Sequence, residues 1–371
     1  MTSTTVLTTG NELNVTLGGE LEITLEDFLK PESNSIVPLC SKENTLYLDS
    51  GRSAIYLALS DILSQGGKRE AWLPRYCCQS VELPFLKLGF TLNYYSTGRD
   101  LNTPCGLPEK LAGETFLFIH YFGKRNLILE QYLEAMKERH SFFIIEDCVQ
   151  AMLNSHPGKF DYAVCSFRKF FPQPDGALLY SHYPLEEGNM IEPADEAFVS
   201  RRLIGKLIRP YSSDKIFLDL FAEAENMIDN FAKPRKISYI SKYLLSRTNA
   251  AEITAKRRNN FFYLINGLKR REYDEDLIHP LFDSLEQGEV PLGLPIVVAP
   301  SYRDRLREYL ADQRVFCPVH WQLKMKEDSL WRHELELSRS ILTLPLDQRL
   351  DFSSLDNLLA KLSDFFQTKK V

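Results

Sequence analysis

The stretch from residue 142 to residue 169 decides the fold. It reads Phe142-Phe143-Ile144-Ile145-Glu146-Asp147-Cys148-Val149-Gln150 and, after a short polar passage, Asp161-Tyr162-Ala163-Val164-Cys165-Ser166-Phe167-Arg168-Lys169. In each half, an apolar run short enough to be a buried strand ends on residues that can do chemistry. Ligands of open α/β sheets bind at the carboxyl ends of the strands. We therefore predict that Asp147, Ser166 and Lys169 face one pocket from adjacent strand ends.

Short apolar runs alternate with helical spacings on both sides of this stretch. The predicted strands are Glu70–Pro74, Phe90–Tyr95, Phe116–His120, Phe142–Ile145, Tyr162–Cys165 and Ala177–Tyr180. The predicted helices are residues 49–67, residues 76–88 with a break at Pro84, and residues 127–139. Such alternation favours an α/β fold with a mostly parallel sheet sandwiched by helices.

The second half of the chain has a different organisation. Residues 197–208 and 216–231 have helical spacing and mixed charge, which is typical of solvated helices. We expect a boundary at Pro234, followed by a long helix over 251–269, short strands over 293–298 and 315–317, a helix over 302–311 and a closing helix over 352–366. The predicted domains are a lead-in (1–35, with a short helix near Leu25–Leu29), a large α/β domain (36–234) and a smaller α+β domain (235–371).

Composition excludes several classes of protein. The chain has 371 residues, a net charge of −6 and no basic run of the kind that binds nucleic acid. No apolar stretch approaches the roughly 18 residues of a membrane span, and the first residues do not resemble a secretory signal. Seven scattered cysteines indicate reduced thiols, so we expect a cytoplasmic protein without a metal site.

Three features together match the needs of pyridoxal phosphate (PLP). A desolvated lysine such as Lys169 can form a Schiff base with a carbonyl group. A carboxylate such as Asp147 can hold the pyridine nitrogen protonated, which makes the ring an electron sink. The small residues of Ser50-Gly51-Arg52-Ser53 open a predicted helix, whose amino end favours an anion. Each feature also has an ordinary explanation: a strand-end cap, a solvated lysine and a serine-capped helix.

The order of these motifs resembles the DegT-like family of sugar aminotransferases, which are fold-type-I PLP-dependent enzymes. The resemblance spans roughly residues 45–365. It rests on Ser50-Gly51-Arg52-Ser53-Ala54, Leu73-Pro74-Arg75-Tyr76-Cys77, His120-Tyr121-Phe122-Gly123, Ile145-Glu146-Asp147-Cys148-Val149-Gln150-Ala151 and Ser166-Phe167-Arg168-Lys169. Weaker matches continue through Arg257-Arg258-Asn259, Val315–Trp321 and Leu344-Pro345-Leu346-Asp347-Gln348.

The resemblance implies a role for each matching position. Lys169 would hold PLP as an aldimine and shuttle a proton, and Asp147 would bind the ring nitrogen; these are the expected catalytic residues. The expected cofactor-binding residues are Gly51, Arg52, Ser53, Tyr76, Asp147, Gln150, Ser166 and Lys169. Within this set, Tyr76 would stack on the ring, and Gln150 would lie by its hydroxyl.

The resemblance also implies partners. We expect a homodimer with shared active sites, an amino-acid donor such as glutamate and a keto-sugar acceptor linked to a nucleotide. His120, His320 and Trp321 lie at predicted strand ends and are candidate substrate contacts, although ordinary packing explains them as well. Two alternatives stay open: another PLP reaction on the same fold, such as elimination, decarboxylation or desulfurisation, or a relative that binds PLP or a sugar nucleotide without turnover.

Three departures from the family pattern stand out. No clear Gly-x-Asn segment, which lends an asparagine to the partner's phosphate site, occurs near residues 205–235. The loop after Lys169 carries Asp175 and one glycine where many members have Gly-Glu-Gly-Gly. Arg52 stands where many members have a small residue. These departures concern the acceptor and the phosphate grip rather than the lysine or the aspartate.

Overall fold

The largest element of the fold is a seven-stranded sheet with the order β2-β8-β7-β6-β5-β3-β4. The computed structural model describes residues 16–35, 37–155, 158–185, 190–211, 216–229, 233–323 and 331–367. The strands of this sheet are β2 (Thr45–Leu48), β3 (Glu70–Pro74), β4 (Thr91–Tyr95), β5 (Thr115–Ile119), β6 (Phe143–Asp147), β7 (Tyr162–Ser166) and β8 (Ala177–Ser181).

The strand directions confirm the predicted mostly parallel sheet. Strands β4, β3, β5, β6 and β7 are parallel to one another, whereas β8 is antiparallel to both β7 and β2. Residue pairs across the sheet place Ile119 beside Asp147, and Asp147 beside Val164. The carboxyl ends of β5, β6 and β7 therefore lie at one edge of the sheet.

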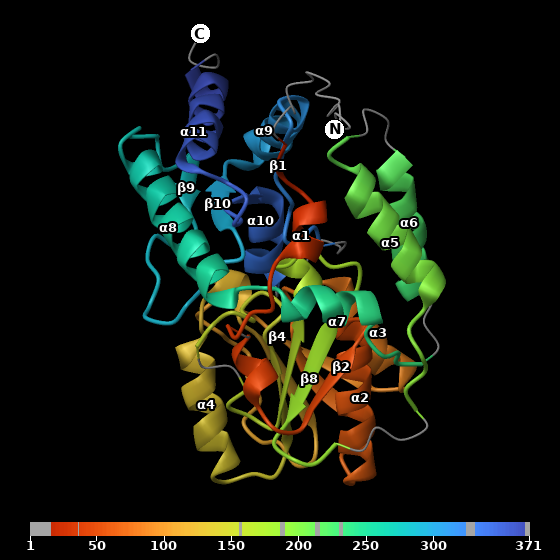
Figure 1. Ribbon diagram of the computed structural model, residues 1–371. Helices are drawn as coiled ribbons and strands as arrows, with labels where there is room; N and C mark the ends of the chain where they lie inside the picture. Colours follow the sequence, from red (N-terminus) through yellow and green to blue (C-terminus); the bar gives the residue numbers. More distant parts are fainter. Residues whose placement is uncertain are drawn as a thin grey trace, which may run out of the picture.

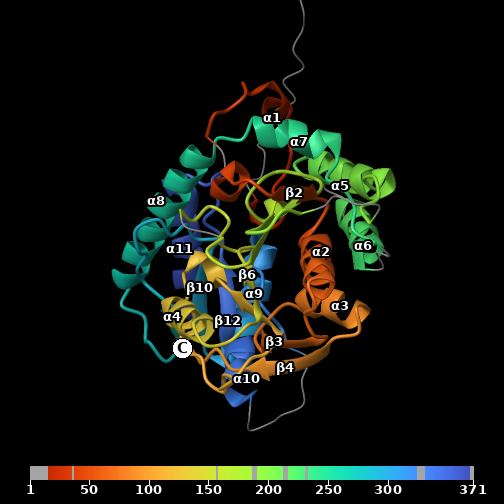
Figure 2. The same cartoon turned by 90° about the horizontal axis from the view of Figure 1, so that it is seen from below.

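Helices cover both faces of the sheet. Helices α2 (Gly51–Ser64) and α3 (Gln79–Lys87) lie on one side of the strands and α4 (Leu127–Lys137) on the other, as Figure 2 shows. Successive side chains of β5 lie on opposite faces of the sheet. Leu117 packs in the core under α2, and Phe118 packs in the core under α4. Both faces of this strand are buried, which explains its uninterrupted apolar run.

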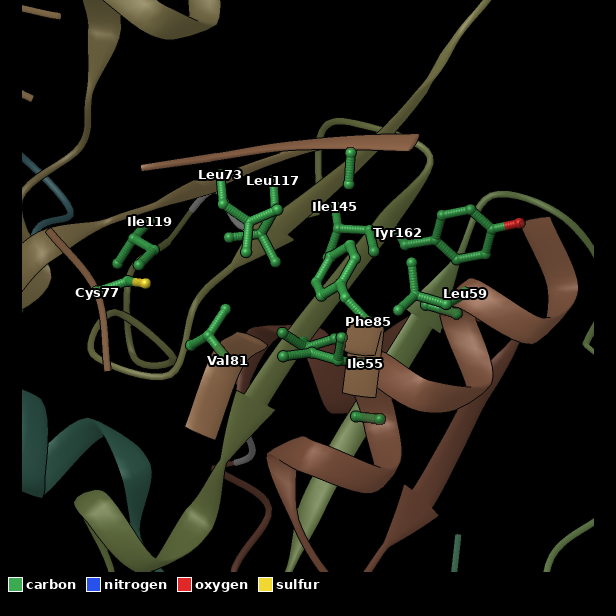
Figure 3. Close-up of a cluster of buried hydrophobic side chains, with 14 of the residues drawn as sticks. Ile55, Leu59, Leu73, Cys77, Val81, Phe85, Leu117, Ile119, Ile145 and Tyr162 are labelled. Carbon is green, nitrogen blue, oxygen red and sulfur yellow. The ribbon is translucent and has the colours of Figure 1, made fainter. Parts of the chain in front are cut away.

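The core under α2 fixes the start of the site helix. Ile55 and Leu59 of α2 meet Phe85 of α3 and Ile145 of β6 (Figure 3). The Ser50 hydroxyl accepts a hydrogen bond from the backbone N–H of Ser53 at 3.3 Å, so the helix begins at Gly51 as its sequence predicts.

The predicted helix over residues 76–88 is wrong at its start and at its break. Helix α3 begins only at Gln79, because Cys78 has an extended backbone with φ −68° and ψ 135°. The helix also continues past Pro84, whose missing N–H costs it a single backbone hydrogen bond. Tyr76 therefore lies in the connection between β3 and α3.

The second half of the chain contains the remaining elements. Its helices are α5 (Glu196–Ile208), α6 (Ile216–Asp229), α7 (Tyr239–Ser246), α8 (Ala250–Lys269), α9 (Pro300–Asp312), α10 (Arg332–Ser340) and α11 (Phe352–Gln367). Its strands are β9 (Ile278–Pro280), β10 (Leu294–Val298), β11 (Val315–Phe316) and β12 (Ile341–Leu344). Strands β12, β10 and β9 form a three-stranded antiparallel sheet.

Figure 1 shows α8, α9 and α11 gathered around this small sheet and α5 beside α6. The expected end of α6 at Phe231 lies outside the described residues. The domain boundaries at residues 35 and 234 stay predictions. No described helix has the length and apolar character that a membrane crossing needs.

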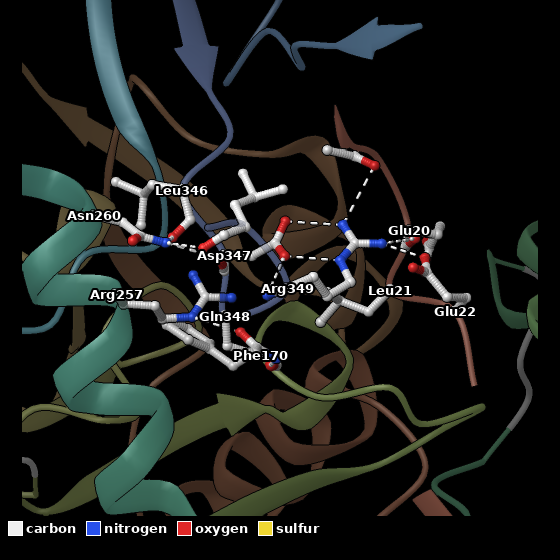
Figure 4. A network of polar contacts seen from close by, with 12 residues as sticks. Glu20, Leu21, Glu22, Phe170, Arg257, Asn260, Leu346, Asp347, Gln348 and Arg349 are labelled. Carbon is white, nitrogen blue, oxygen red and sulfur yellow. Dashed lines mark hydrogen bonds and ion pairs between the residues drawn. The ribbon is translucent and has the colours of Figure 1, made fainter. Parts of the chain in front are cut away.

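The lead-in connects the two halves. The short helix predicted at Leu25–Leu29 is present as α1, and β1 (Leu17–Gly18) pairs in parallel with β11. Between them, Glu22 forms ion pairs with Arg209 at the end of α5 and with Arg349 (Figure 4). The lead-in is thus held by both α5 and the smaller half.

Gly123, which ends the His-Tyr-Phe-Gly motif, offers a test of this arrangement. Its φ is +91°, and a Cβ there would lie 2.1 Å from the backbone oxygen of Val290. We expect Gly123→Ala to lower the free energy of unfolding by about 1–3 kcal/mol more than Gly106→Ala, measured by urea denaturation. Gly106 is the control because it also has a positive φ, +70°, but no atom within 4 Å of its Cβ position. Equal losses would contradict the close approach.

Candidate functional site

Asp147 is a buried carboxylate with few hydrogen bonds. It ends β6, is 3% exposed, and accepts a hydrogen bond from the backbone N–H of Val149 at 2.9 Å. Burial raises the pKa of Asp147 to about 6, against the Val149 hydrogen bond and the electrostatic interactions with His120 and Lys169, which lower it. The site therefore disfavours the negative charge that a carboxylate normally carries.

Lys169 lies close enough to Asp147 for their charges to interact. It ends the short 3₁₀ helix η3 (Phe167–Lys169) that follows β7, and its side chain is exposed. Among the described residues, it has no hydrogen bond or ion pair. An accessible amine therefore lies beside a buried carboxylate, as the strand-end argument predicts.

The residue after the lysine is held from two sides. The guanidinium carbon of Arg257 lies 4.6 Å from the ring centroid of Phe170, and the Gln348 amide donates to the Phe170 carbonyl at 2.8 Å (Figure 4). Arg257 in turn donates to Gln348 at 3.1 Å. These contacts position the backbone that carries Lys169.

The loop beyond Phe170 is fixed by α7. Asp175 is buried and accepts hydrogen bonds from the backbone N–H of Ser238 at 2.9 Å and from the hydroxyls of Ser238 and Ser241. The aspartate that departs from the family's glycine-rich loop is therefore a structural residue that anchors the first turn of α7.

The start of α2 lies next to a second buried carboxylate. The Ser50 hydroxyl donates to Asp49 at 3.0 Å. Burial raises the pKa of Asp49 to about 6, although hydrogen bonds from Ser53 and Ser50 lower it. The Arg52 side chain points to Glu225 of α6, 3.8 Å away. Asp49 and Glu225 were not expected from the sequence.

Gln150 and Ser166 lie at the same edge of the sheet. The side-chain oxygen of Gln150 accepts a hydrogen bond from the backbone N–H of Phe122 at 2.7 Å, and Gln150 is buried. Ser166 ends β7 and is 7% exposed, and its hydroxyl does not cap η3. Gln150 therefore lies shortly after β6, and Ser166 ends β7 directly before η3, the helix that carries Lys169.

Tyr76, His320 and Trp321 form one aromatic group. Tyr76 is fully buried, with ring centroids 6.2 Å from Tyr121 and 5.8 Å from Trp321. Its hydroxyl donates to the carbonyl of His320 at 2.7 Å and accepts from the N–H of Trp321 at 3.0 Å. Burial, and then the charge of Lys169, lower the pKa of His320 to about 3. His320 therefore lies near the lysine as a neutral imidazole.

His120 belongs to a buried polar group at the end of β5. Its Nε2 lies 2.9 Å from a carboxylate oxygen of Glu146, and the thiol of Cys148 donates to that carboxylate at 3.5 Å. Burial raises the pKa of Cys148 well above its usual value. These hydrogen bonds account for the closeness of the three side chains.

A cavity of about 210 Å³ lies next to the Tyr121–Phe122 segment that follows β5. Tyr121 and Phe122 line it from the large half, together with Lys124 and Asn126, and Phe282 lines it from the smaller half. Lys169 and Asp147 are not among its lining residues. The cavity therefore adjoins the predicted site through Tyr121 and Phe122 without containing its reactive groups.

Comparisons with known proteins place the fold. No family model matches the chain, and no curated protein matches it in sequence. Among solved structures, the aminotransferase TlmJ from Streptoalloteichus hindustanus is similar, with a TM-score of 0.62, 16% identity, and coverage of 89% of this chain and 87% of that chain. The chain has the fold of these aminotransferases. The predicted α/β fold of PLP-dependent fold-type-I enzymes is therefore confirmed.

Two further structures agree. The sugar aminotransferase CalS13 from Micromonospora echinospora has a TM-score of 0.59 and 14% identity, with 86% of this chain and 87% of that chain covered. NtdA from Bacillus subtilis, solved with bound cofactor PMP, has a TM-score of 0.59 and 15% identity, with 86% and 72% covered. At these sequence identities, structural similarity shows the fold alone. The chemistry has to be inferred from the residues of this chain.

The raised pKa of Asp147 predicts how stability changes with pH. An unfolded aspartate has a pKa of about 3.9, so between about pH 4 and pH 6 the native state binds more protons than the unfolded state. The contribution of Asp147 to the free energy of unfolding should therefore fall as pH rises through this range. Asp147→Asn removes the titration and should make the cofactor-free protein about 3 kcal/mol more stable at pH 7.

The gain from Asp147→Asn should shrink towards zero below pH 4. Urea denaturation at a series of pH values measures it, with Asp276→Asn as the control because Asp276 is exposed. A gain that does not depend on pH would contradict the assignment to Asp147 ionisation.

Proposed function

We propose that the chain is a PLP-dependent aminotransferase of the DegT-like family. One observation carries the proposal: a buried, sparsely hydrogen-bonded carboxylate, Asp147, lies beside an accessible amine, Lys169, at the carboxyl edge of a fold-type-I sheet. A raised carboxylate pKa beside a titratable partner is typical of functional sites.

The residues fit PLP. A protonated pyridine nitrogen would donate a hydrogen bond to Asp147 and would compensate the charge that burial now disfavours. Lys169 would hold the aldehyde end of the cofactor through Nζ. The amino end of α2, with Gly51, Arg52 and Ser53, would hold the phosphate. When bound, PLP supplies an electron sink for the bond that is broken at the amino carbon.

The chain's own groups divide the remaining work. The Lys169 amine is accessible, so Nζ can accept the proton from the substrate's amino carbon and return it to a neighbouring atom. His320 stays neutral beside it because its pKa is about 3, so it does not compete as a proton acceptor near neutral pH. Tyr76 fixes the His320–Trp321 segment through its two hydrogen bonds.

The substrates follow from the family resemblance. We propose an amino acid as donor, with glutamate the first to test, and a keto sugar linked to a nucleotide as acceptor. The proposed enzyme is a cytoplasmic homodimer with shared active sites. The structural similarity to CalS13, a sugar aminotransferase, supports this substrate class, and the similarity to the aminotransferase TlmJ supports the reaction.

The visible absorbance spectrum with added PLP tests the proposal. Wild-type protein should show a near-visible band that shifts when glutamate is added. In Lys169→Ala this band should be absent, or it should no longer shift when glutamate is added. The rate of transamination should fall by about 10²–10⁴-fold or more, because the covalent anchor and the proton-transfer group are removed. Lys68→Ala is the control, since Lys68 is an exposed lysine paired with Glu114.

The same spectra separate the alternatives. A band that glutamate leaves unchanged would point to another amino donor or another PLP reaction. The absence of any band at saturating PLP would contradict the enzyme and would favour a relative without turnover.

A further inference from the structure

The cavity of about 210 Å³ has no part in the proposed transamination. Residues 100–102 after β4 and residues 121–126 after β5 contribute to its lining from the large half, and residues 281–282 after β9 line it from the smaller half. Neither Lys169 nor Asp147 lines it. Small molecules usually bind in cavities of this kind, which form where domains meet and contain a few well-placed polar groups. The cavity is therefore a candidate site for a ligand that does not react at Lys169.

The inner wall of the cavity is apolar and largely aromatic. Leu101, Tyr121 and Phe122 are buried residues of this wall. The hydroxyl of Tyr121 already donates to the backbone carbonyl of Tyr76, so Tyr121 offers its ring to a ligand. Across the cavity, Phe282 stacks on Phe261 of α8, with ring centroids 5.8 Å apart. The rings are thus held in place without a ligand, which reduces the entropy that a ligand loses on binding.

The polar side chains of the cavity include both donors and acceptors. Asn102 is exposed, and its side-chain amide makes no hydrogen bond within the described part of the chain. Asp100 offers a carboxylate, and Lys124 offers an amine. Arg125 donates to Glu130 through Nε at 3.0 Å and through Nη2, whereas its Nη1 has no acceptor among the described residues. Several hydrogen-bonding groups of both kinds therefore remain for a ligand.

The charges around the cavity are already compensated. Lys124 pairs with the buried carboxylate of Glu289 at 2.7 Å, and Glu289 also accepts the backbone N–H of Arg125 at 2.8 Å. Arg125 pairs with Glu130. An anionic ligand would compete with these carboxylates and would be repelled by Asp100, whereas a cationic ligand would be repelled by Lys124 and Arg125. An uncharged ligand therefore fits the cavity best.

The size of the cavity limits the ligand to about one ring. Pockets for drug-sized ligands usually have volumes of about 300–1,000 Å³, and this cavity is smaller. A nucleotide-linked sugar, with its base, ribose, phosphates and sugar, does not fit. A single sugar ring has C–H groups on its faces and hydroxyl groups at its edge, which match aromatic walls and a mixed polar rim. A flat aromatic ring would leave most of the rim without partners.

We propose that this cavity binds an uncharged monosaccharide ring. Phe122 and Phe282 pack against the faces of the ring, and Asp100 and Asn102 form hydrogen bonds with its hydroxyl groups. This sugar is a different ligand from the keto sugar of the proposed reaction, because Lys169 does not line the cavity. The sugar site itself does not depend on the proposed function.

Phe122 connects the cavity to the candidate catalytic residues. Its backbone N–H donates to the Gln150 side chain at 2.7 Å, and its ring centroid lies 5.8 Å from that of His320. Its φ is +55°, which is unfavourable for a residue other than glycine, so contacts must hold it there. Gln150 supplies one contact, and the N–H of Leu292 supplies another by donating to the Phe122 carbonyl at 3.1 Å. A sugar on Phe122 is therefore an effector of cofactor binding at Gln150, and this role alone rests on the proposed function.

Asn102→Ala tests the polar rim. Saturation-transfer-difference NMR of the whole protein with glucose, galactose and mannose should show saturable binding of at least one hexose. Asn102→Ala should weaken this binding by about 3–10-fold, because it removes the hydrogen bonds of one side chain. Asn34→Ala is the control, since Asn34 is also an exposed asparagine outside the helices and strands, but it does not line the cavity. Equal affinities of the two variants, or no saturable binding of any hexose, would overturn the proposal.

Phe282→Leu tests the aromatic wall. It keeps an apolar side chain and removes the ring face, so hexose binding should weaken by about 3–10-fold. Phe262→Leu is the matched control, because Phe262 also packs on Phe261, with centroids 5.4 Å apart, but does not line the cavity. Circular dichroism melting confirms that each variant folds. Equal affinities of the two variants, or tighter binding of uracil than of every hexose, would refute the sugar assignment.

A titration of PLP with and without the hexose separates the effector role from the site. The bound hexose should change the Kd of PLP by about fivefold or more in wild type, and it should not do so in Asn102→Ala. If the Kd does not change although the hexose binds through Asn102, the effector role fails and the sugar site stands. If wild-type protein shows no PLP band but binds the hexose through Asn102, the proposed function fails and the sugar site stands.

Discussion

The burial of the Asp147 carboxylate is the constraint on which the rest of the structure depends. A carboxylate with one backbone hydrogen bond is unfavourable in a protein interior, so the fold must hold it there by other means. Parallel pairing of β6 with β5 and β7 does this, because it sets the carboxyl ends of three strands at one edge. The same pairing brings η3 and its lysine to that edge.

The sequence predicts the large sheet well because its strands are buried on both faces. Such strands are continuous apolar runs, and Thr115–Ile119 and Tyr162–Ser166 are examples with every residue buried. Elements of the smaller half were harder to predict. β12 and α7 are short, and packing against distant segments rather than local periodicity determines them. The residue types of Tyr76–Cys78 are compatible with a helix. In the structure, however, this segment is an extended connection, and Tyr76 is hydrogen-bonded to His320 and Trp321.

The residues of the candidate site also divide into those that the sequence predicts and those that it does not. Asp147 and Lys169 were predictable because each follows an apolar run by a fixed, short distance. Glu225 was not, because its mixed-charge helix has the pattern of a solvated surface, and only tertiary packing brings it to Arg52 and Arg168. Asp49 was missed for a related reason: its burial depends on β2 lying at the edge of the sheet beside β8. Local patterns thus identify residues on strand ends, whereas charge pairing between distant helices is determined by tertiary packing.

The lead-in segment has a mechanical consequence for domain movement. Gly18 lies beside Phe316 of β11, while Glu20 and Glu22, a few residues later, hold Lys206 and Arg209 of α5. A hinge rotation that opened the two halves would have to stretch this short tether or break its ion pairs. The tether would therefore limit how far the two halves could separate, and because the cations of its ion pairs are buried, salt would screen these pairs only weakly.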